Sequence, residues 1–272
     1  MASYTEGDVL PRDVRLHYYR DSGGGARPLI FAHGLTDSGL CWAPIAEQLR
    51  GQYDLIMYDA RGHGQSDRAP ANAYSFDTLA DDLAGLVREL GLHQPIVLGH
   101  SLGAATAALA AARSPGLFGA LLLEDPPGRP ETARDGSPDQ AAMLKWRNDL
   151  IADQQLSREQ LIGIERARSP KWSAAELEPW ADSKPRVDPN ALCVITNPTS
   201  DWYDLIEQVD CPLLLITGDP AQGAIISQAF ADELDGRWQR GQVAHIPGAG
   251  HCIRRDQPEQ FMQAVNTFLS SL

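Results

Sequence analysis

The sequence predicts an α/β protein built on a mostly parallel central sheet, with helices on both faces and one helical insertion. One observation is that short apolar runs alternate with amphipathic helical patterns, which is typical of βαβ units. A second is that strand-like runs stop over residues 126–209, where polar helical pieces broken by Pro and Gly follow one another. A third is size, because 272 residues, 43% of them hydrophobic, are enough to bury a large core.

Seven runs have the length and apolar content of strands. They cover residues 14–21, 28–34, 53–59, 95–101, 119–125, 212–219 and 241–248. Between them, apolar residues recur with helical periodicity. The expected helices cover residues 42–50, 78–90 and 102–113, and a closing helix begins at Pro258, a residue suited to a first helical turn.

These elements divide the chain into a core and an insertion. The core is expected to comprise residues 1–125 and 210–272, and a helical cap is expected to comprise residues 126–209. Within the cap, the sequence predicts a linker over 129–139 and helices over 140–155 and 157–168. Four of the six tryptophans fall in this insertion.

The composition excludes some partners. A formal net charge of −13 leaves too few clustered Lys and Arg for a surface that binds nucleic acid or an anionic membrane. No segment approaches the about 20 strongly apolar residues of a membrane span, and the first residues lack the apolar run of a signal peptide. We therefore expect a cytoplasmic protein whose partner is a small molecule. The oligomeric state is not predicted.

The cysteines lack the spacing of a metal site or of a CxxC redox motif. We therefore expect reduced thiols, no metal and no cofactor. The four cysteines are Cys41, Cys193, Cys211 and Cys252.

The stretch GHSLG, residues 99–103, places Ser101 between two glycines, where a predicted strand ends and a predicted helix begins. Such a turn is sharp and strained, and small flanking residues let neighbouring backbone approach. It holds the serine hydroxyl above the sheet edge at a helix N-terminus, where the helix dipole favours developing negative charge. The pattern therefore predicts that Ser101 is a nucleophile rather than an ordinary turn residue.

His33 and Gly34 end another predicted strand, PLIFAHG. If Ser101 attacks a carbonyl, the oxyanion needs two backbone N–H donors, one following the nucleophile and one from an earlier loop. We expect these donors to be the amides of Leu102 and Leu35, with Gly34 allowing a close approach of the backbone. The side chain of His33 is expected to pack and to hydrogen-bond within the core.

Four motifs follow one another along the chain: HG at 33–34, DARGHGQSD at 59–67, GHSLG at 99–103 and GAGHC at 248–252. With these motifs in this order, and a helical insertion at this place, the sequence resembles the α/β-hydrolase superfamily from about residue 14 onward. The resemblance implies the α/β-hydrolase fold and a triad of serine, acid and histidine. It also implies that Asp59 and Arg61 tie turns together rather than contact substrate.

The resemblance identifies His251, which follows the last predicted strand, as the general base. A loop in that place brings the imidazole to the same sheet edge as Ser101. The remaining histidines are expected to be structural (His63, His100 and His245, with His100 packing away from the nucleophile) or to lie at the surface or in turns (His17 and His93).

The acid of the triad is the open position. In this family it commonly follows the strand written here as PLLLITGD in a G-x-x-D pattern, but Asp219 comes directly after the glycine, too early for that pattern. The family's alternative acid ends the preceding strand, where Asp125 stands in LLLEDPP. We favour Asp125, with Asp219 second and Glu124 third. Because neighbouring strand residues face opposite sides, only one of Asp125 and Glu124 should orient His251.

We therefore expect a metal-free serine hydrolase that cleaves a carboxylic ester or lactone through an acyl-enzyme on Ser101. The expected substrate is small and hydrophobic, including aromatic and cyclic compounds, and tryptophans are the candidate contacts for it: Trp42, Trp146, Trp172, Trp180 and Trp202. Two alternatives stay open. One is hydrolysis of a carbon–carbon bond in a ring-cleavage product, and the other is a protein of this fold that binds a small ligand without turnover.

Overall fold

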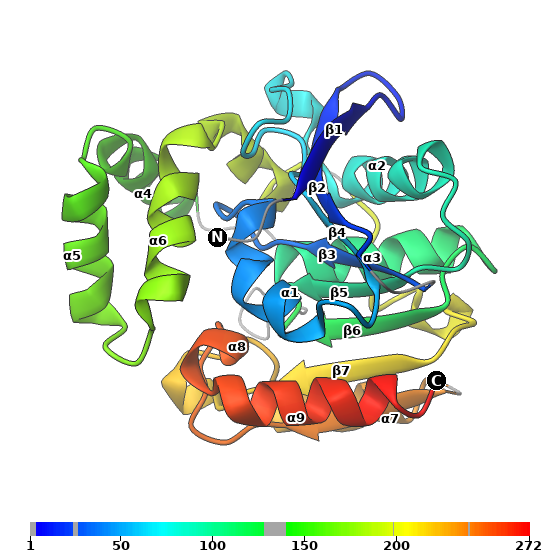
Figure 1. The fold of residues 1–272 in the computed structure, drawn as a ribbon. Helices are drawn as coiled ribbons and strands as arrows, with labels where there is room; N and C mark the ends of the chain where they lie inside the picture. Colours follow the sequence, from blue (N-terminus) through cyan, green and yellow to red (C-terminus); the bar gives the residue numbers. More distant parts are fainter. Residues whose placement is uncertain (1–3, 24–26, 128–139, 198, 239) are drawn as a thin grey trace.

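The computed structural model of the chain describes residues 4–23, 27–127, 140–197, 199–238 and 240–272. Its centre is an eight-stranded sheet with the strand order β1-β2-β4-β3-β5-β6-β7-β8 (Figure 1). Neighbouring strands from β4 to β8 in this order are parallel, whereas β2 is antiparallel to β1 and to β4. The mostly parallel sheet agrees with the predicted fold class. The strands are β1 (Thr5–Val9), β2 (Leu16–Asp21), β3 (Pro28–Ala32), β4 (Asp54–Tyr58), β5 (Ile96–His100), β6 (Ala120–Glu124), β7 (Leu213–Thr217) and β8 (Gly241–His245).

Each of the seven predicted runs contains one strand. In β3, β4, β5, β6 and β7 every residue is buried. Strands covered by helices on both faces have continuous apolar runs rather than alternating ones. That continuity makes these five strands recognisable in the sequence.

The strand β1 is not among the strands that the sequence predicts. Its residues TEGDV are mostly exposed and pair with β2 at the edge of the sheet, so they carry little apolar signal. The presence of β1 also makes the expectation for His17 wrong. His17 is buried rather than at the surface, because β1 pairs alongside it and the carboxylate of Asp8 lies 2.9 Å from its Nδ1. His93 is exposed, as expected.

Helices cover both faces of the sheet (Figure 1). Two core clusters define the faces: α2, α3 and α7 contribute to one, and α1 and α9 to the other. The sequence predicts all of these except α7, and the very short α8 is also new. The helices of the core are α1 (Ala43–Leu49), α2 (Phe76–Glu89), α3 (Leu102–Arg113), α7 (Gln228–Asp235), α8 (Ile253–Asp256) and α9 (Pro258–Leu269), and the 3-10 helices are η1 (Gly39–Trp42), η2 (Ala71–Ala73), η3 (Lys184–Arg186), η4 (Pro189–Ile195), η5 (Ile206–Gln208) and η6 (Pro220–Gln222).

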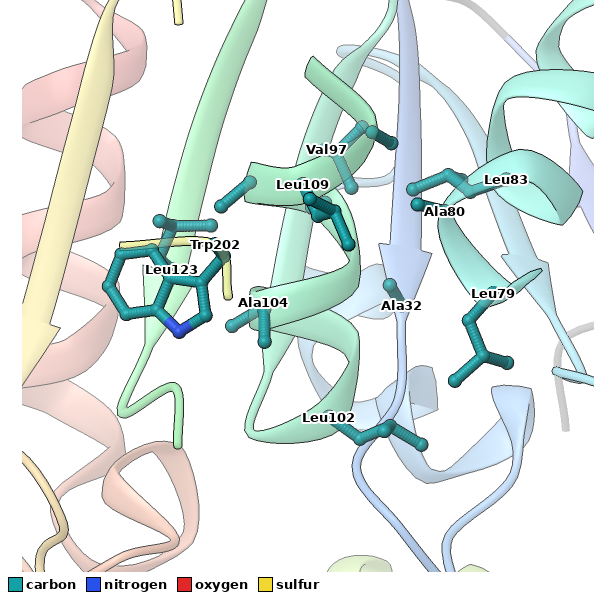
Figure 2. Packing of buried hydrophobic residues seen from close by; sticks show 14 of the residues in the cluster. Ala32, Leu79, Ala80, Leu83, Val97, Leu102, Ala104, Leu109, Leu123 and Trp202 are labelled. Atoms are coloured by element: carbon teal, nitrogen blue, oxygen red, sulfur yellow. The ribbon is translucent and has the colours of Figure 1, made fainter. Parts of the chain in front are cut away.

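The alanine-rich helix α3 lies in the middle of the first core cluster. Figure 2 shows it between α2, which contributes Ala80 and Leu83, and the side chains of Trp202 and Leu123. A Cβ at Gly103, in the first turn of α3, would collide with the carbonyl group of Ala32 at the end of β3. Small residues therefore let α3 approach the sheet closely, and this approach places its N-terminus beside the end of β3.

Between β6 and β7 the chain forms a helical segment, residues 140–195. Figure 1 shows α4, α5 and α6 together beyond the end of the sheet toward which the parallel strands point. The helix α5 begins with a capping box, in which Ser157 and Gln160 satisfy each other's backbone amides. The predicted linker 129–139 lies outside the described residues. The helices of the segment are α4 (Gln140–Asp153), α5 (Arg158–Arg168) and α6 (Ala174–Ser183).

Within the described ranges, no helix has the length and apolar character needed to cross a membrane. The four cysteines, all of which are described, are free thiols, as expected from their spacing.

Candidate active site

Ser101 is the single residue between the last residue of β5 and the first residue of α3. Its backbone has φ 51° and ψ −116°, a conformation outside the regions that L-residues commonly adopt. The amide of Ser101 donates to the carbonyl of Glu124 on β6 at 2.9 Å, which fixes the turn to the neighbouring strand. The strained turn predicted from GHSLG is therefore present, and such strain in a rigid setting is typical of functional sites.

Asp125 is the carboxylate that contacts His251. The Nδ1 atom of His251 lies 2.6 Å from Oδ2 of Asp125, across two loops far apart in the sequence. The Asp125 side chain is fully buried, whereas the His251 side chain is 31% exposed. Because Nδ1 faces an acceptor, it carries the proton and Nε2 keeps its lone pair. This arrangement leaves Nε2 available as a general base.

The carboxylate of Asp125 is held by two backbone amides that sequence reasoning missed. The amide of Ile225 donates to Oδ2 at 2.8 Å, and the amide of Ile226 donates to Oδ1 at 3.0 Å. Both belong to GDPAQGAII, the loop that carries the alternative acid Asp219. The loop thus supports the carboxylate instead of supplying it. Backbone donors leave no side-chain signature, so the sequence has no signal for them.

Asp219 has different partners. Its Oδ2 accepts the amide of Gly248 at 2.6 Å, and its Oδ1 lies 3.0 Å from Nε2 of His245. The amide of Gly250 is held in turn by Oδ2 of Asp256 at 2.8 Å. These contacts anchor the loop that carries the proposed base, residues 248–251, from both sides.

His100 lies against His251 instead of packing only away from the nucleophile. Its Nε2 donates to the carbonyl of His251 at 3.0 Å, and the two ring centroids are 4.7 Å apart. Burial lowers the pKa of His100 well below its usual value, so the ring is neutral. The residue before Ser101 therefore fixes the backbone of the residue that would activate Ser101.

The loop after β3, residues 34–37, is the candidate oxyanion loop. A Cβ added to Gly34 would lie 3.4 Å from Cβ of Ser101 and 2.6 Å from Nδ1 of His100. The loop therefore approaches the turn at Ser101 this closely only because residue 34 is glycine. The predicted donors, the amides of Leu35 and Leu102, therefore belong to two backbone segments that meet at Ser101. Their role in binding an oxyanion remains a prediction.

Two neutral histidines support this loop. His33 accepts the amide of Ala60 on Nε2 at 2.9 Å, and its Nδ1 donates to the carbonyl of Gly34 at 2.9 Å. His63 accepts the amide of Thr36 on Nε2 at 3.3 Å, and its Nδ1 donates to the carbonyl of Arg61 at 3.0 Å. Each ring needs one nitrogen unprotonated. Burial lowers the pKa of His33 and lowers that of His63 to about 3, which keeps both rings in that form.

Asp59 and Arg61 tie turns together, as the family resemblance implies. Asp59 accepts the amides of Gly39 at 2.7 Å and Gln65 at 2.8 Å. Arg61 is fully buried and forms a two-bond pair with Asp82 on α2, at 2.6 and 2.8 Å.

Three of the five predicted substrate-binding tryptophans have a cation over the ring: Arg254 lies 4.2 Å from the ring centroid of Trp42, Arg255 4.6 Å from that of Trp172, and Lys184 4.6 Å from that of Trp180. Trp202 is buried and donates to the carbonyl of Pro127 at 2.7 Å, and Trp146 is 40% exposed on α4. These contacts give four of the rings packing partners. Their role in substrate binding remains a prediction.

A buried ionic cluster lies behind the oxyanion loop, with Asp37 at its centre. Asp37 contacts Lys184 at 3.4 Å, Arg255 at 2.8 Å and Arg254 at 3.3 Å. Burial alone would raise the pKa of Asp37, but these three cations outweigh it and hold the pKa well below its usual range. The cluster comprises Asp37, Glu124, Glu176, Lys184, Arg254 and Arg255, with Glu124 bound to Arg254 at 2.9 Å and Glu176 to Arg255 at 3.1 Å.

Glu124 is thereby paired with Arg254, and Asp125 is the carboxylate that contacts His251, in agreement with the expectation that only one of the two orients the imidazole. Among the described residues, no three His, Cys, Asp or Glu side chains are grouped as ligands for a metal ion.

Comparison with known proteins defines the class of this chain. The model of the alpha/beta hydrolase fold family matches residues 27–254. The chain is 30% identical over 270 residues to N-formylmaleamate deformylase of Pseudomonas putida, covering 97% of this chain and 96% of that protein. It therefore belongs to the α/β-hydrolase family.

Two further matches agree with this assignment. The chain is 28% identical over 262 residues to 2-(acetamidomethylene)succinate hydrolase of Mesorhizobium japonicum, covering 93% of this chain and 91% of that protein. The crystal structure of E-2-(acetamidomethylene)succinate hydrolase superposes with a TM-score of 0.79 at 25% identity, covering 98% of this chain and 99% of that one.

Proposed function

We propose that this protein is a serine hydrolase that cleaves an acyl bond of a small molecule through an acyl-enzyme on Ser101. The observation that carries the proposal is the 2.6 Å contact between His251 and Asp125 at the sheet edge where Ser101 occupies a strained turn. Nucleophilic acyl transfer requires a nucleophile, a base and an acid that orients the base, and on this fold Ser101, His251 and Asp125 would fill these roles.

In the proposed reaction, Nε2 of His251 takes the hydroxyl proton as Ser101 attacks the carbonyl carbon. Asp125 keeps the proton on Nδ1 and stabilises the imidazolium that forms. The amides of Leu35 and Leu102 receive the oxyanion. His251 then returns its proton to the leaving group, and a water activated by the same nitrogen releases the acid from Ser101.

The favoured substrate is an uncharged ester or lactone. The two arginines that follow the base in the sequence, Arg254 and Arg255, are already bound to Asp37, Glu124 and Glu176, so a substrate carboxylate would have to displace a buried carboxylate to reach them. An uncharged acyl group requires no such exchange.

A second candidate substrate has the acyl group on nitrogen. The names of the two relatives describe a formyl group on nitrogen and an acetamido group, whose acetyl is on nitrogen, in molecules that are also acids. The chemistry at Ser101 is the same for oxygen and nitrogen leaving groups, apart from the stronger need for protonation of nitrogen by His251.

Matched substrates separate these candidates. The purified protein is assayed with acetyl and butyryl esters of p-nitrophenol, simple lactones, and N-formyl and N-acetyl derivatives of a small unsaturated dicarboxylic acid. The favoured function predicts the highest kcat/KM for an ester or lactone, and the second candidate predicts it for an N-acyl acid. A ring-cleavage diketone in the same panel tests the carbon–carbon alternative. The S101A variant must lose the activity in every case, and turnover that survives in it overturns the proposal.

A further inference from the structure

The carbonyl of Thr36 is the point at which the helical segment holds the oxyanion loop. Nζ of Lys184 donates to this oxygen at 2.8 Å, and Oγ of Ser183 lies 3.0 Å from it and shares its single proton with the carbonyl of Trp180 at 2.6 Å. The same ammonium lies 3.1 Å from Oγ1 of Thr36 and 3.4 Å from Oδ1 of Asp37. The three N–H groups of Lys184 therefore have three acceptors, all in residues 34–37 or their side chains.

Thr36 has a backbone conformation that a β-branched residue rarely adopts. Its φ is 70°, in the left-handed region, where the Cβ atom crowds the following backbone. The amide of Thr36 is bound to His63, and its carbonyl and hydroxyl are bound to Lys184. Such a conformation persists only where the surroundings fix it, and Lys184 supplies two of the contacts that do so.

The position of Thr36 makes this conformation consequential. Its peptide bond joins it to Leu35, the predicted oxyanion donor, so a rotation at Thr36 would turn that part of the loop away from Ser101. Lys184 is itself well fixed, because it is 3% exposed and its ammonium lies 4.6 Å from the ring centroid of Trp180.

We infer that Lys184 is a positioning residue for the reaction at Ser101. From the helical segment it holds the carbonyl of Thr36, and so keeps the oxyanion loop in the strained conformation that presents the Leu35 amide. The inference rests on the proposed function. It differs from a role in binding substrate, since the three N–H groups of Lys184 already have acceptors in the protein.

The central experiment compares K184M with the wild type in steady-state hydrolysis of the best ester of the substrate panel. Rates are divided by the concentration of sites that a fluorophosphonate labels to completion, which removes any unfolded fraction. We expect kcat per site to fall about 10–100-fold with KM within about threefold, because removing an oxyanion donor outright costs about 100–1,000-fold. The midpoint of the acid limb of the pH profile should stay unchanged, because His251 and Asp125 are untouched. The control K145M, at an exposed lysine of α4, should match the wild type.

A rescue experiment separates positioning from general destabilisation. Glycine adopts the left-handed conformation without steric cost. The double variant K184M/T36G should therefore have a kcat at least about threefold higher than that of K184M. K184R, which keeps the charge and the donors, should be less impaired than K184M. If K184M yields no folded protein, S183A removes the other donor to the same carbonyl and should lower kcat several-fold.

The inference fails if kcat per labelled site in K184M, or in S183A where K184M does not fold, stays within about twofold of the wild type. It also fails if KM rises while kcat is unchanged, because that result would make Lys184 a substrate-binding residue. A wild-type protein that is neither labelled nor active would overturn the proposed function itself, so the two failures are distinguishable.

Discussion

His251 and Asp125 are joined by a 2.6 Å contact between Nδ1 and Oδ2, and the carboxylate is held in place by the amides of Ile225 and Ile226. The buried acid therefore has three donors, and its orientation toward the imidazole is fixed by backbone as well as by the histidine. This geometry makes Asp125 and Asp219 separable by experiment.

The first prediction concerns the identity of the acid. D125N should lower kcat about 10⁴-fold, because an amide in this position favours the wrong tautomer of the imidazole. D219N should lower kcat far less, because Asp219 anchors the backbone of Gly248 and does not contact His251. Steady-state kinetics on both variants checks this. A loss of several orders of magnitude in D219N alone would mean that the acid is wrongly assigned.

The second prediction concerns stability and pH. Burial lowers the pKa of His63 to about 3, against a usual value of 6.5. Between these values the unfolded chain binds a proton that the folded chain does not. The stability contributed by neutral His63 is therefore full above about pH 6.5 and is lost as pH falls toward 3, by about 1.4 kcal/mol per pH unit.

Urea unfolding at pH 6.5 and pH 5.0 measures this dependence. H63Q should lower the slope of the unfolding free energy against pH by up to the contribution of one proton, about 1.4 kcal/mol per pH unit. The reason is that glutamine accepts the Thr36 amide without titrating. H93Q, at an exposed histidine, should leave the dependence unchanged. Equal slopes for the wild type and H63Q would show that His63 does not carry the effect.

The third prediction concerns the buried pair of Arg61 and Asp82. D82N should destabilise the fold by about 3–5 kcal/mol, because it removes the buried charge partner of the guanidinium and leaves it only the exposed carboxylate of Asp13 at 3.1 Å. D149N breaks the exposed pair of Lys145 and Asp149 on α4 and should cost no more than about 0.5 kcal/mol. Chemical denaturation provides both values, and similar small costs for the two variants would refute the argument.

The fourth prediction separates packing from substrate contact among the tryptophans. Trp202 is 4% exposed within the core around α3 (Figure 2), so W202A should lower the free energy of unfolding by about 3–5 kcal/mol. Trp146 is 40% exposed, and W146A should change the free energy of unfolding by less than about 0.5 kcal/mol. Kinetics on W146A tests the remaining question, since a raised KM at unchanged stability would assign this ring to the substrate.

Local patterns predict the parts of the site that lie on regular elements. Ser101 is recognisable because the strand, turn and helix around it are contiguous, and His251 because it follows the last strand. The sequence alone does not decide between Asp125 and Asp219, because the choice depends on which loop faces the imidazole, a relationship between distant segments. The family resemblance favours Asp125, because Asp219 comes too early for the G-x-x-D pattern, and the contact between Asp125 and His251 agrees with this choice.

The supporting contacts could not be predicted for a different reason. The amides of Ile225 and Ile226 act through backbone atoms, which every residue possesses. Lys184 reaches Thr36 from the helical segment, 148 residues further along the chain, and nothing in KPR indicates a buried ammonium. Tryptophans in the insertion indicate a large apolar surface, but composition does not distinguish a ring that stacks on Arg255 from one that contacts a ligand.

The central claim is that Ser101 is an activated nucleophile. The direct measurement is reaction of the native protein with a fluorophosphonate, followed by peptide mass spectrometry. The account predicts one stoichiometric adduct on Ser101, with none in S101A and a much slower reaction in H251A. An unlabelled Ser101 in folded wild-type protein, or equal labelling rates in the wild type and H251A, would contradict it.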